Sequence, residues 1–399
     1  MSTVRTSSAA PSRDPGPSTA TSLARCVGGV NRFLTQHWAR SVHLHGGGDF
    51  SDLLSLGDVD RILSTMALRL PAFRLVKDGR TLDPSAYVRS GRVGSKGIND
   101  LIDVGRVYAQ FHEGATIVLQ GLQRYWEPLA RFCRDLELFL TQPVQANAYI
   151  TPPEAHGLRV HHDSHDVFAL QTFGHKRWVT YPAGSDGAGD PTLDVELAPG
   201  DCLYVPKGVP HAARTVEATS LHITIGVRAS TWQDVVRHVL DQAVDELALQ
   251  EPLPVGFAHD GERFAELVAV RLEALARWVR DVDPQAVGTA MSRRFWSTRT
   301  PLLDGQLEQL VALDALSDSS CLTRRPGSVC ALDTDGERLT ATLGDRQLRL
   351  PLAVEPALRL ILQRPSFVVA DLGEYLDEPS RLVLARRLVR EGLLMVVRA

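Results

Sequence analysis

The sequence predicts a protein that is mainly β in its middle and helical on both sides, with the central strands forming a double-stranded β-helix (jelly-roll) barrel. Between residues 144 and 228, short runs of alternating polar and apolar residues are separated by Gly and Pro turns, which is typical of antiparallel strands. In VQANAYIT (144–151) and SLHITIGV (220–227), every second residue is apolar. Residues with metal-binding or acid–base chemistry also fall on polar faces, so these faces are expected to line a barrel interior.

The part of the chain before the barrel is expected to complete the same domain. Residues 1–22 are rich in Ser, Pro, Ala and Thr and lack apolar periodicity, which is typical of a disordered tail. Residues 71–79 (PAFRLVKDG) predict a strand entering a turn, and residues 127–140 (EPLARFCRDLELFL) predict a helix of period 3.6. The first folded domain is therefore expected over residues 23–229.

After the barrel, residues 230–320 predict helices whose apolar residues form stripes. A capping-box sequence begins at Ser230, and the stripes run from Val235 to Leu247 and over residues 264–279. Apolar helix surface in this amount indicates either a homodimer interface or packing within the chain.

The C-terminal part is expected to be a separate α+β domain. The segment 317–328 (SDSSCLTRRPGS) predicts a linker, and residues 326–399 predict a winged helix with helices near 355–363 and 381–391. Residues 329–399 carry 10 basic and 10 acidic side chains, so contact with nucleic acid is not expected.

The composition excludes several classes of protein. The 399 residues have a net charge of −4, which argues against a general attraction to nucleic acid or to an anionic membrane. The sequence has neither a run of about 18 apolar residues nor a signal-peptide pattern, so a cytoplasmic protein without membrane contact is expected. The five cysteines include no CxxC pair, which argues against a disulfide framework or a cysteine zinc site.

The densest group of metal-ligating residues is HHDSHD at residues 161–166. On a strand, His161 and Asp163 point to the same face, whereas His162 points away. An imidazole and a carboxylate presented together supply two ligands of a 2-His-1-carboxylate triad, which leaves positions open on Fe(II). His211, in GDCLYVPKGVPHAA, is the expected third ligand, because the gap of fifty residues leaves room for the strands between them.

An HxD pair alone is common, and the metal site is indicated by this pair together with GDxLYxPxGxxHxA at this spacing. His162 and His165 are expected to lie outside the ligand set. Zinc is an alternative metal, because two His and one carboxylate do not choose between metals.

Lys176, in GHKRW, is the expected partner of an anion. Only four of the 43 basic residues are lysines, and a lysine is a compact charge that can meet a carboxylate inside a small cavity. An exposed charge on a strand is the alternative. Lys207, in the turn before His211, is expected to face solvent.

With these residues assembled, the chain resembles the JmjC-type (cupin) oxygenases that depend on Fe(II) and 2-oxoglutarate, and within them the ribosomal oxygenase branch. The segments that carry the resemblance are LVKDG (75–79), ATIVLQGLQRYWEPLARFCRDLE (115–137), QANAYITPP (145–153), HHDSHDVFALQTFGHKRW (161–178), GDCLYVPKGVPHAA (200–213) and SLHITIGV (220–227). The resemblance is strong over residues 25–230. It is weaker over the parts that form a dimerisation region and a winged-helix cap in that branch.

The resemblance implies roles for five residues. His161, Asp163 and His211 would bind Fe(II). Lys176 would pair with the distal carboxylate of 2-oxoglutarate, and the hydroxyl group of Tyr149 would assist it.

The resemblance also implies that Asn147 and Thr224 line the pocket for this co-substrate. Relatives commonly have a Ser where this chain has Gly226, which removes a hydroxyl group from the pocket. The position of His162 is often Tyr in relatives.

The implied reaction consumes 2-oxoglutarate and O2, releases succinate and CO2, and hydroxylates a substrate carbon. Relatives act on side chains such as Arg or His in ribosomal proteins, so a protein or peptide substrate is expected, with a homodimeric enzyme. The alternatives are hydroxylation of a small molecule or a biosynthetic peptide, and a non-catalytic barrel that acts as a binding or scaffold protein. Lysine demethylation uses the same iron chemistry, but no sequence feature marks a chromatin reader.

Overall fold

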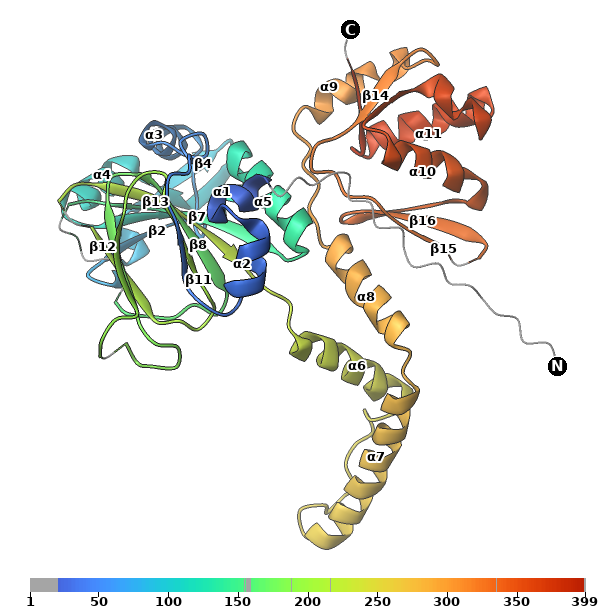
Figure 1. Cartoon of the computed structure of the whole chain (residues 1–399), viewed down its shortest axis with the longest axis horizontal. Coiled ribbons are helices and arrows are strands. Elements are labelled where there is room, and N and C mark those ends of the chain that lie inside the picture. Colours follow the sequence, from blue (N-terminus) through green and yellow to red (C-terminus); the bar gives the residue numbers. More distant parts are fainter. Residues whose placement is uncertain are drawn as a thin grey trace. The chain divides into compact units, whose positions relative to one another are not determined.

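Figure 1 presents the computed structural model of the chain, which describes residues 21–153, 155, 159–187, 189–215, 217–334 and 336–397. These residues form two compact units, which divide between Ala229 and Ser230. Residues 1–20 of the predicted tail lie outside the described residues, and Thr21 and Ser22 are the first residues of helix α1.

The first unit contains helices before and between its strands. The helices are α1 (Thr21–Val27), α2 (Val30–Gln36), α3 (Leu56–Thr65), α4 (Val104–His112) and α5 (Glu127–Leu140), with 3-10 turns η1 (Pro84–Ala86) and η2 (Leu122–Arg124). The strands are β1 (His43–His45), β2 (Phe73–Lys77), β3 (Arg80–Thr81), β4 (Val88–Val93), β5 (Lys96–Ile102), β6 (Thr116–Leu119), β7 (Val144–Thr151), β8 (Asp166–Phe173), β9 (Lys176–Thr180), β10 (Leu193–Leu197), β11 (Cys202–Val205), β12 (His211–Thr215) and β13 (Ser220–Val227). Strands β7 and β13 cover VQANAYIT and SLHITIGV in full, which confirms the strands predicted from their alternation.

Two antiparallel sheets build the barrel. The larger sheet has the order β1-β11-β8-β13-β7-β6-β2-β3, the smaller one has the order β10-β9-β12, and β4 and β5 form a separate hairpin. Strand β13 lies between β7 and β8, so His222 is in register with Tyr149 on one side and with Gln171 on the other. This order brings segments about 75 residues apart in the chain side by side.

The apolar faces of β7 and β13 pack against helices. Ala146, Ile150 and Leu221 are at most 3% exposed and share the largest hydrophobic core with Leu129 and Leu136 of helix α5. Since successive side chains of a strand alternate between faces, the polar residues of β7 and β13 lie on the opposite face, inside the barrel. The predicted two-sided strands are confirmed.

A second, smaller apolar core fills part of the barrel interior. Its buried members come from β8, β9, β10, β11 and the turn before β12: Ala169, Trp178, Leu197, Leu203, Val205 and Val209. The polar side chains of β7, β9, β12 and β13 are left to form the rest of the interior.

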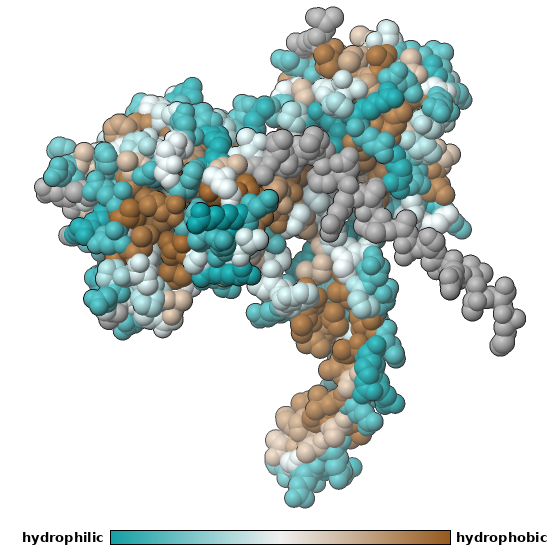
Figure 2. Space-filling view, in the orientation of Figure 1, coloured by the Kyte–Doolittle hydropathy of each residue, from teal (hydrophilic) through white to brown (hydrophobic). Residues whose placement is uncertain are grey.

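The second unit begins with helices α6 (Trp232–Glu246), α7 (Gly261–Asp281), α8 (Pro284–Ser297) and α9 (Gln306–Val311), and turn η3 (Ala312–Ala315). The cap of α6 lies one residue later than predicted, because the N–H and the hydroxyl group of Thr231 donate to Asp234 at 2.7 and 2.8 Å. Helix α7 has no buried residue, and Figure 2 shows hydrophobic residues along the α6–α7 segment.

The remainder of the second unit is a small α+β fold. Its elements are β14 (Cys321–Arg324), β15 (Ala331–Thr334), β16 (Arg338–Leu343), β17 (Arg346–Pro351), η4 (Leu352–Val354), α10 (Glu355–Gln363), β18 (Ser366–Val368), η5 (Val369–Glu374), α11 (Glu378–Arg390) and β19 (Leu394–Val396). Strand β14 falls inside the predicted linker 317–328, and its Leu322 is fully buried in the core of this fold, so the linker prediction is wrong there. Helix α10 is confirmed at its predicted bounds. Among the described helices, none is long and apolar enough to cross a membrane.

Candidate metal centre

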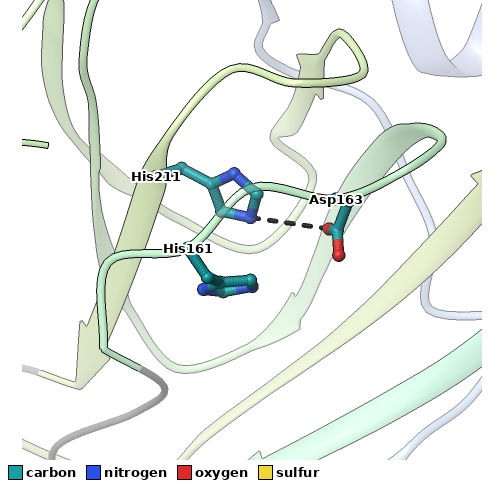
Figure 3. A group of neighbouring side chains, drawn as sticks. All are labelled: His161, Asp163 and His211. Carbon is teal, nitrogen blue, oxygen red and sulfur yellow. Dashed lines mark ion pairs between the residues drawn. The ribbon is translucent and has the colours of Figure 1, made fainter. Parts of the chain in front are cut away.

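His161, Asp163 and His211 come together as the sequence predicts (Figure 3). Their potential ligand atoms all lie within 4.8 Å of one another, and Nε2 of His211 is 3.6 Å from Oδ2 of Asp163. Atoms at these separations can share one metal ion. His162 is exposed and does not belong to the group.

A backbone bridge, rather than a regular strand, holds the two histidines beside each other. The N–H of His161 donates to the carbonyl of His211 at 3.1 Å, and the N–H of His211 donates back at 2.8 Å. The prediction that His161 and Asp163 share a strand face is wrong, because β8 begins only at Asp166. Instead, Gly208 N donates to the carbonyl of Asp163 at 3.0 Å, which ties the turn before His211 to the carboxylate ligand.

Backbone carbonyls orient both imidazoles. Nδ1 of His161 lies 2.8 Å from the carbonyl of Arg159, and Nδ1 of His211 lies 3.0 Å from the carbonyl of Val209. A proton on Nδ1 satisfies these contacts and leaves the Nε2 lone pair free for a metal. Burial lowers the pKa of His211, which favours the neutral form that a metal needs.

The donor set suits a divalent metal with free coordination positions. Two imidazoles and one carboxylate, with no thiolate, are the ligands of non-haem Fe(II) oxygenases, in which the remaining positions are open. Zinc accepts the same ligand types, so the donors fit iron without excluding zinc.

Lys176 is buried inside the barrel, with 3% of its surface exposed. Its Nζ donates to Oγ1 of Thr151 at 2.9 Å, and no carboxylate pairs with it in the described part of the chain. Burial lowers the pKa of Lys176 to about 7. A buried ammonium group without a counter-ion is costly, so the site suits an anion supplied from outside the chain. The alternative of an exposed strand charge is wrong.

Further buried polar atoms near Lys176 lack hydrogen-bond partners among the described residues. Oγ1 of Thr215 belongs to the cross-strand neighbour of Lys176, and Oγ of Ser220 belongs to the cross-strand neighbour of Thr151. Nδ1 of His222 is unpaired as well. Two more such atoms are Nε1 of Trp178 and Oε1 of Gln171. Buried polar atoms are normally paired, and the hydroxyl groups of Thr215 and Ser220 and the indole N–H of Trp178 can donate hydrogen bonds. Together with the lysine, these donors fit a bound anion such as a dicarboxylate, whereas Oε1 of Gln171 can only accept.

The other pocket residues predicted from the sequence lie on the same face of the larger sheet. The hydroxyl group of Tyr149 lies near Arg74 and Thr224, and burial raises its pKa, so it stays protonated. Oδ1 of Asn147 accepts a hydrogen bond from Gly121 N at 3.0 Å, so this oxygen is committed to the turn before η2. Within the described chain, Lys176 donates its hydrogen bond to Thr151.

Two rings without an assigned role connect the metal ligands to Tyr149. Trp178 stacks on His211 with ring centroids 5.8 Å apart, and it meets His222 edge-on at 5.5 Å. His222 in turn stacks on Tyr149 at 4.9 Å with an interplanar angle of 8°. Burial lowers the pKa of His222 well below its ordinary value, so this ring is neutral.

The alternation of the strands contains the signal for these missed residues. His222 lies on the polar face of β13, midway between Ser220 and Thr224, and Trp178 is two residues after Lys176 on β9. Period 2 places each of them on the barrel face, beside Lys176 and Thr224, which were predicted as pocket residues.

Comparisons with known proteins agree with this barrel and triad. The JmjC domain family matches residues 120–235. Ribosomal oxygenase 2 of Bos taurus is 31% identical over 360 residues, which cover 77% of this chain and 75% of that protein. The bifunctional lysine-specific demethylase and histidyl-hydroxylase NO66 of Drosophila persimilis is 30% identical over 292 residues, which cover 64% of this chain but only 39% of that protein.

Among solved structures, the Escherichia coli ribosomal oxygenase YcfD matches 92% of this chain and 98% of its own, with a TM-score of 0.54 and 18% identity. That protein has also been solved with cobalt and 2-oxoglutarate. At this identity the match shows a shared fold, whereas the bovine relative is similar in sequence over most of both chains. The chain therefore belongs to the JmjC-domain ribosomal oxygenase family.

Proposed function

We propose that this chain is an oxygenase that uses Fe(II), 2-oxoglutarate and O2 to hydroxylate an Arg or His side chain of a ribosomal protein. The observation that carries the proposal is the presence of two features in one barrel. These are the His161–Asp163–His211 triad and the buried Lys176, for which the described residues offer no counter-ion.

When bound, Fe(II) and 2-oxoglutarate supply the activation of O2, and the reaction ends in succinate, CO2 and a hydroxylated substrate carbon. His161, Asp163 and His211 would hold the metal through two imidazole nitrogens and one carboxylate oxygen. Lys176 would neutralise the distal carboxylate of 2-oxoglutarate. Tyr149, which burial keeps protonated, can donate its hydroxyl hydrogen to the same anion.

The remaining pocket residues support this arrangement. Asn147 and Thr224 are cross-strand neighbours on the barrel face of the larger sheet, next to the pair of Tyr149 and His222. Trp178 and His222 lie between the metal ligands and Tyr149, because Trp178 stacks on His211 and His222 stacks on Tyr149. Side chains held in this way are positioned before a substrate arrives.

The names of the relatives support the substrate class. The bovine protein is called a ribosomal oxygenase, and the NO66 proteins are called histidyl-hydroxylases as well as lysine-specific demethylases. This chain spans 39% and 29% of the length of the two NO66 proteins from Drosophila persimilis and Drosophila pseudoobscura pseudoobscura. A ribosomal substrate would place the enzyme in the cytoplasm.

The remaining domains have roles in the same proposal. Residues 23–229 are the catalytic domain, residues 230–320 join two copies into a homodimer, and residues 326–399 form a winged helix that contacts protein. The exposed apolar residues of α6 and α7 support the dimer, since a helix without buried residues gains stability from a partner surface.

The test is to incubate the purified protein with Fe(II), 2-oxoglutarate and total ribosomal proteins from host cells that lack it. Succinate is expected to form, and mass spectrometry is expected to find one added oxygen atom on an Arg or His residue. His211→Ala should form no succinate above a metal-free control, whereas His112→Ala, on the exposed end of α4, should match the wild type. Iron-loaded wild-type protein that forms no succinate would refute the oxygenase. Succinate without oxygen on any ribosomal protein would refute the substrate.

A further inference from the structure

A glycine on the polar face of β13 makes room for the side chain of His165. A Cβ atom on Gly226 would lie 2.7 Å from both Cδ2 and Nε2 of His165, and 3.2 Å from Cγ of Gln145. Gly226 is not among the glycines with positive φ, so its backbone does not require glycine. A side chain at this position would have to displace the imidazole of His165.

The contact places His165 over the catalytic face of the larger sheet. Gly226 shares its face of β13 with Thr224 and His222, because successive side chains alternate. Gln145 is the cross-strand neighbour of Gly226 on β7, and its side chain lies on the same face. The imidazole of His165 therefore lies over the sheet that carries the pocket, although the sequence indicates only that it is no metal ligand.

The cross-strand pairs of β7 and β13 run from a partly exposed end to a buried one. The pairs on this face are Gln145–Gly226, Asn147–Thr224, Tyr149–His222 and Thr151–Ser220. Successive pairs are about 7 Å apart, so the first and last are about 20 Å apart. Gln145 and His165 are partly exposed, whereas Thr151 is fully buried beside Lys176.

His165 and Gln145 have polar groups that the protein itself does not use. In the described parts of the chain, neither the imidazole of His165 nor the amide of Gln145 has a hydrogen-bond partner. The backbone next to His165 is nevertheless anchored, because the carboxylate of Asp166 accepts hydrogen bonds from the hydroxyl group of Tyr204 at 2.9 Å and from Lys207 N at 3.1 Å. A fixed backbone with unpaired side-chain groups suits the binding of a visiting molecule.

We propose that His165 and Gln145 form a polar lip, over Gly226, that hydrogen-bonds the substrate side chain to be hydroxylated. The proposal rests on the proposed function. The anion partner Lys176 is at the far end of the strands, so the lip is too distant to serve the distal carboxylate of 2-oxoglutarate. His165 is also only two residues after Asp163, so the Cα atoms of these two residues are at most about 7 Å apart. An Arg or His side chain can donate a hydrogen bond from an N–H group to the side-chain carbonyl of Gln145. The imidazole of His165 can form a hydrogen bond with a second polar atom of the substrate.

The test measures how many substrate oxygens are gained for each succinate formed, with total ribosomal proteins from host cells lacking the chain as the probe. His165→Ala should lower this ratio about ten-fold, as expected for one lost hydrogen bond to the substrate. His162→Ala, an exposed histidine of the same loop, should keep the wild-type ratio. If the wild type adds oxygen and His165→Ala keeps its ratio within two-fold, the lip is refuted and the oxygenase stands. If the wild type adds none, the proposed substrate fails first.

Gly226→Ser tests the contact independently, because its new side chain must displace the imidazole of His165. Its ratio should fall as in His165→Ala, and the double variant should lose no more than either single variant. Losses that multiply would refute the coupling. If a thermal melt shows that Gly226→Ser does not fold, His165→Asn provides the test instead. This variant keeps hydrogen-bonding groups, so its ratio should lie between those of His165→Ala and the wild type. A ratio no higher than that of His165→Ala would refute the lip.

Discussion

The barrel interior and the α6–α7 helices break the usual pattern of burial in opposite directions. Inside the barrel, Lys176 is 3% exposed and the hydroxyl group of Ser220 is buried without a partner in the described chain. On the helices, Trp232 is 83% exposed, and Val270 and Leu272 are more than half exposed. A buried charge calls for a small anion, whereas an exposed apolar stripe calls for a protein surface. The two regions therefore indicate ligands of opposite chemistry.

The two regions also differ in how much they depend on those ligands. The barrel strands are held by hydrogen-bonded sheets and by apolar cores on both sides, so they can carry an unpaired lysine without losing their geometry. Helix α7 buries none of its residues, so its stability depends on what covers it. Substituting Lys176 should therefore impair binding of the anion while the barrel stays folded. Adding charge to helix α7 should instead weaken its contact with a partner surface.

The largest effect is expected from Lys176→Met, which replaces the buried charge by an apolar side chain of similar length. The KM for 2-oxoglutarate should rise between about 10-fold and about 100-fold, because a charge-assisted contact with the carboxylate is lost. Metal binding, followed by calorimetry, should persist, since no metal ligand is altered. Lys96→Met, at an exposed position of strand β5, is the matched control. An unchanged KM would show that another residue binds the anion.

The same substitution should make the ligand-free protein more stable. The pKa of Lys176 is about 7 in the fold and near 10.5 when the chain is unfolded, so between these values the unfolded chain binds more protons. Stability therefore falls as the pH drops from about 10.5 to about 7, and Lys176→Met should remove this loss. At pH 7 its Tm should exceed that of the wild type by at least about 2 °C. A Tm of Lys176→Met below that of the wild type would show that the buried lysine does not destabilise the ligand-free fold.

The next effect is a pH dependence of 2-oxoglutarate binding. Because the pKa of the unliganded Lys176 is about 7, most of the protein carries a neutral lysine above this pH and must take up a proton to bind the dianion. The Kd should rise with pH above 7, by no more than about ten-fold per pH unit. The Kd is measured by titrating the protein with 2-oxoglutarate in the absence of oxygen. Lys176→Arg remains charged throughout this pH range, so its Kd should change less with pH. A wild-type Kd independent of pH between 7 and 9 would contradict this reading.

Local patterns of the sequence predicted the strands and the metal ligands well. The alternation of residues 144–151 and 220–227 is confirmed in full, because one face of each strand packs on helices and the other lines the barrel. The metal ligands could be identified from the sequence because they belong to a pattern, an HxD pair followed by GDxLYxPxGxxHxA. Recognising this pattern requires no knowledge of side-chain contacts, and it contains His161, Asp163 and His211. The antiparallel bridge between His161 and His211 was not predictable, since it depends on a turn fifty residues away.

Contacts between strands distant in the sequence were beyond such patterns. Thr151 as the partner of Lys176, and His165 over Gly226, arise only when the strand order is known. Strand β14 was missed because its short polar run, CLTR, resembles a linker until Leu322 is seen in the core. The alternation of a strand predicts which face a residue occupies. The residues beside it on that face depend on the order and register of the strands in the sheet.

The smallest change in catalysis, but a clear change in assembly, is expected from charges on the exposed helix. Val268 and Leu272 lie one turn apart on α7 and are both exposed. If this surface joins two copies, Val268→Asp combined with Leu272→Asp should convert a dimer into a monomer in light scattering, because each carboxylate would lose its water at the interface. Glu273→Lys, on the same helix outside the apolar stripe, should leave the dimer intact. A wild-type protein that is monomeric at micromolar concentration would refute the dimer. The exposed apolar stripe would then have to bind a different protein, just as the barrel binds a ligand that the chain does not supply.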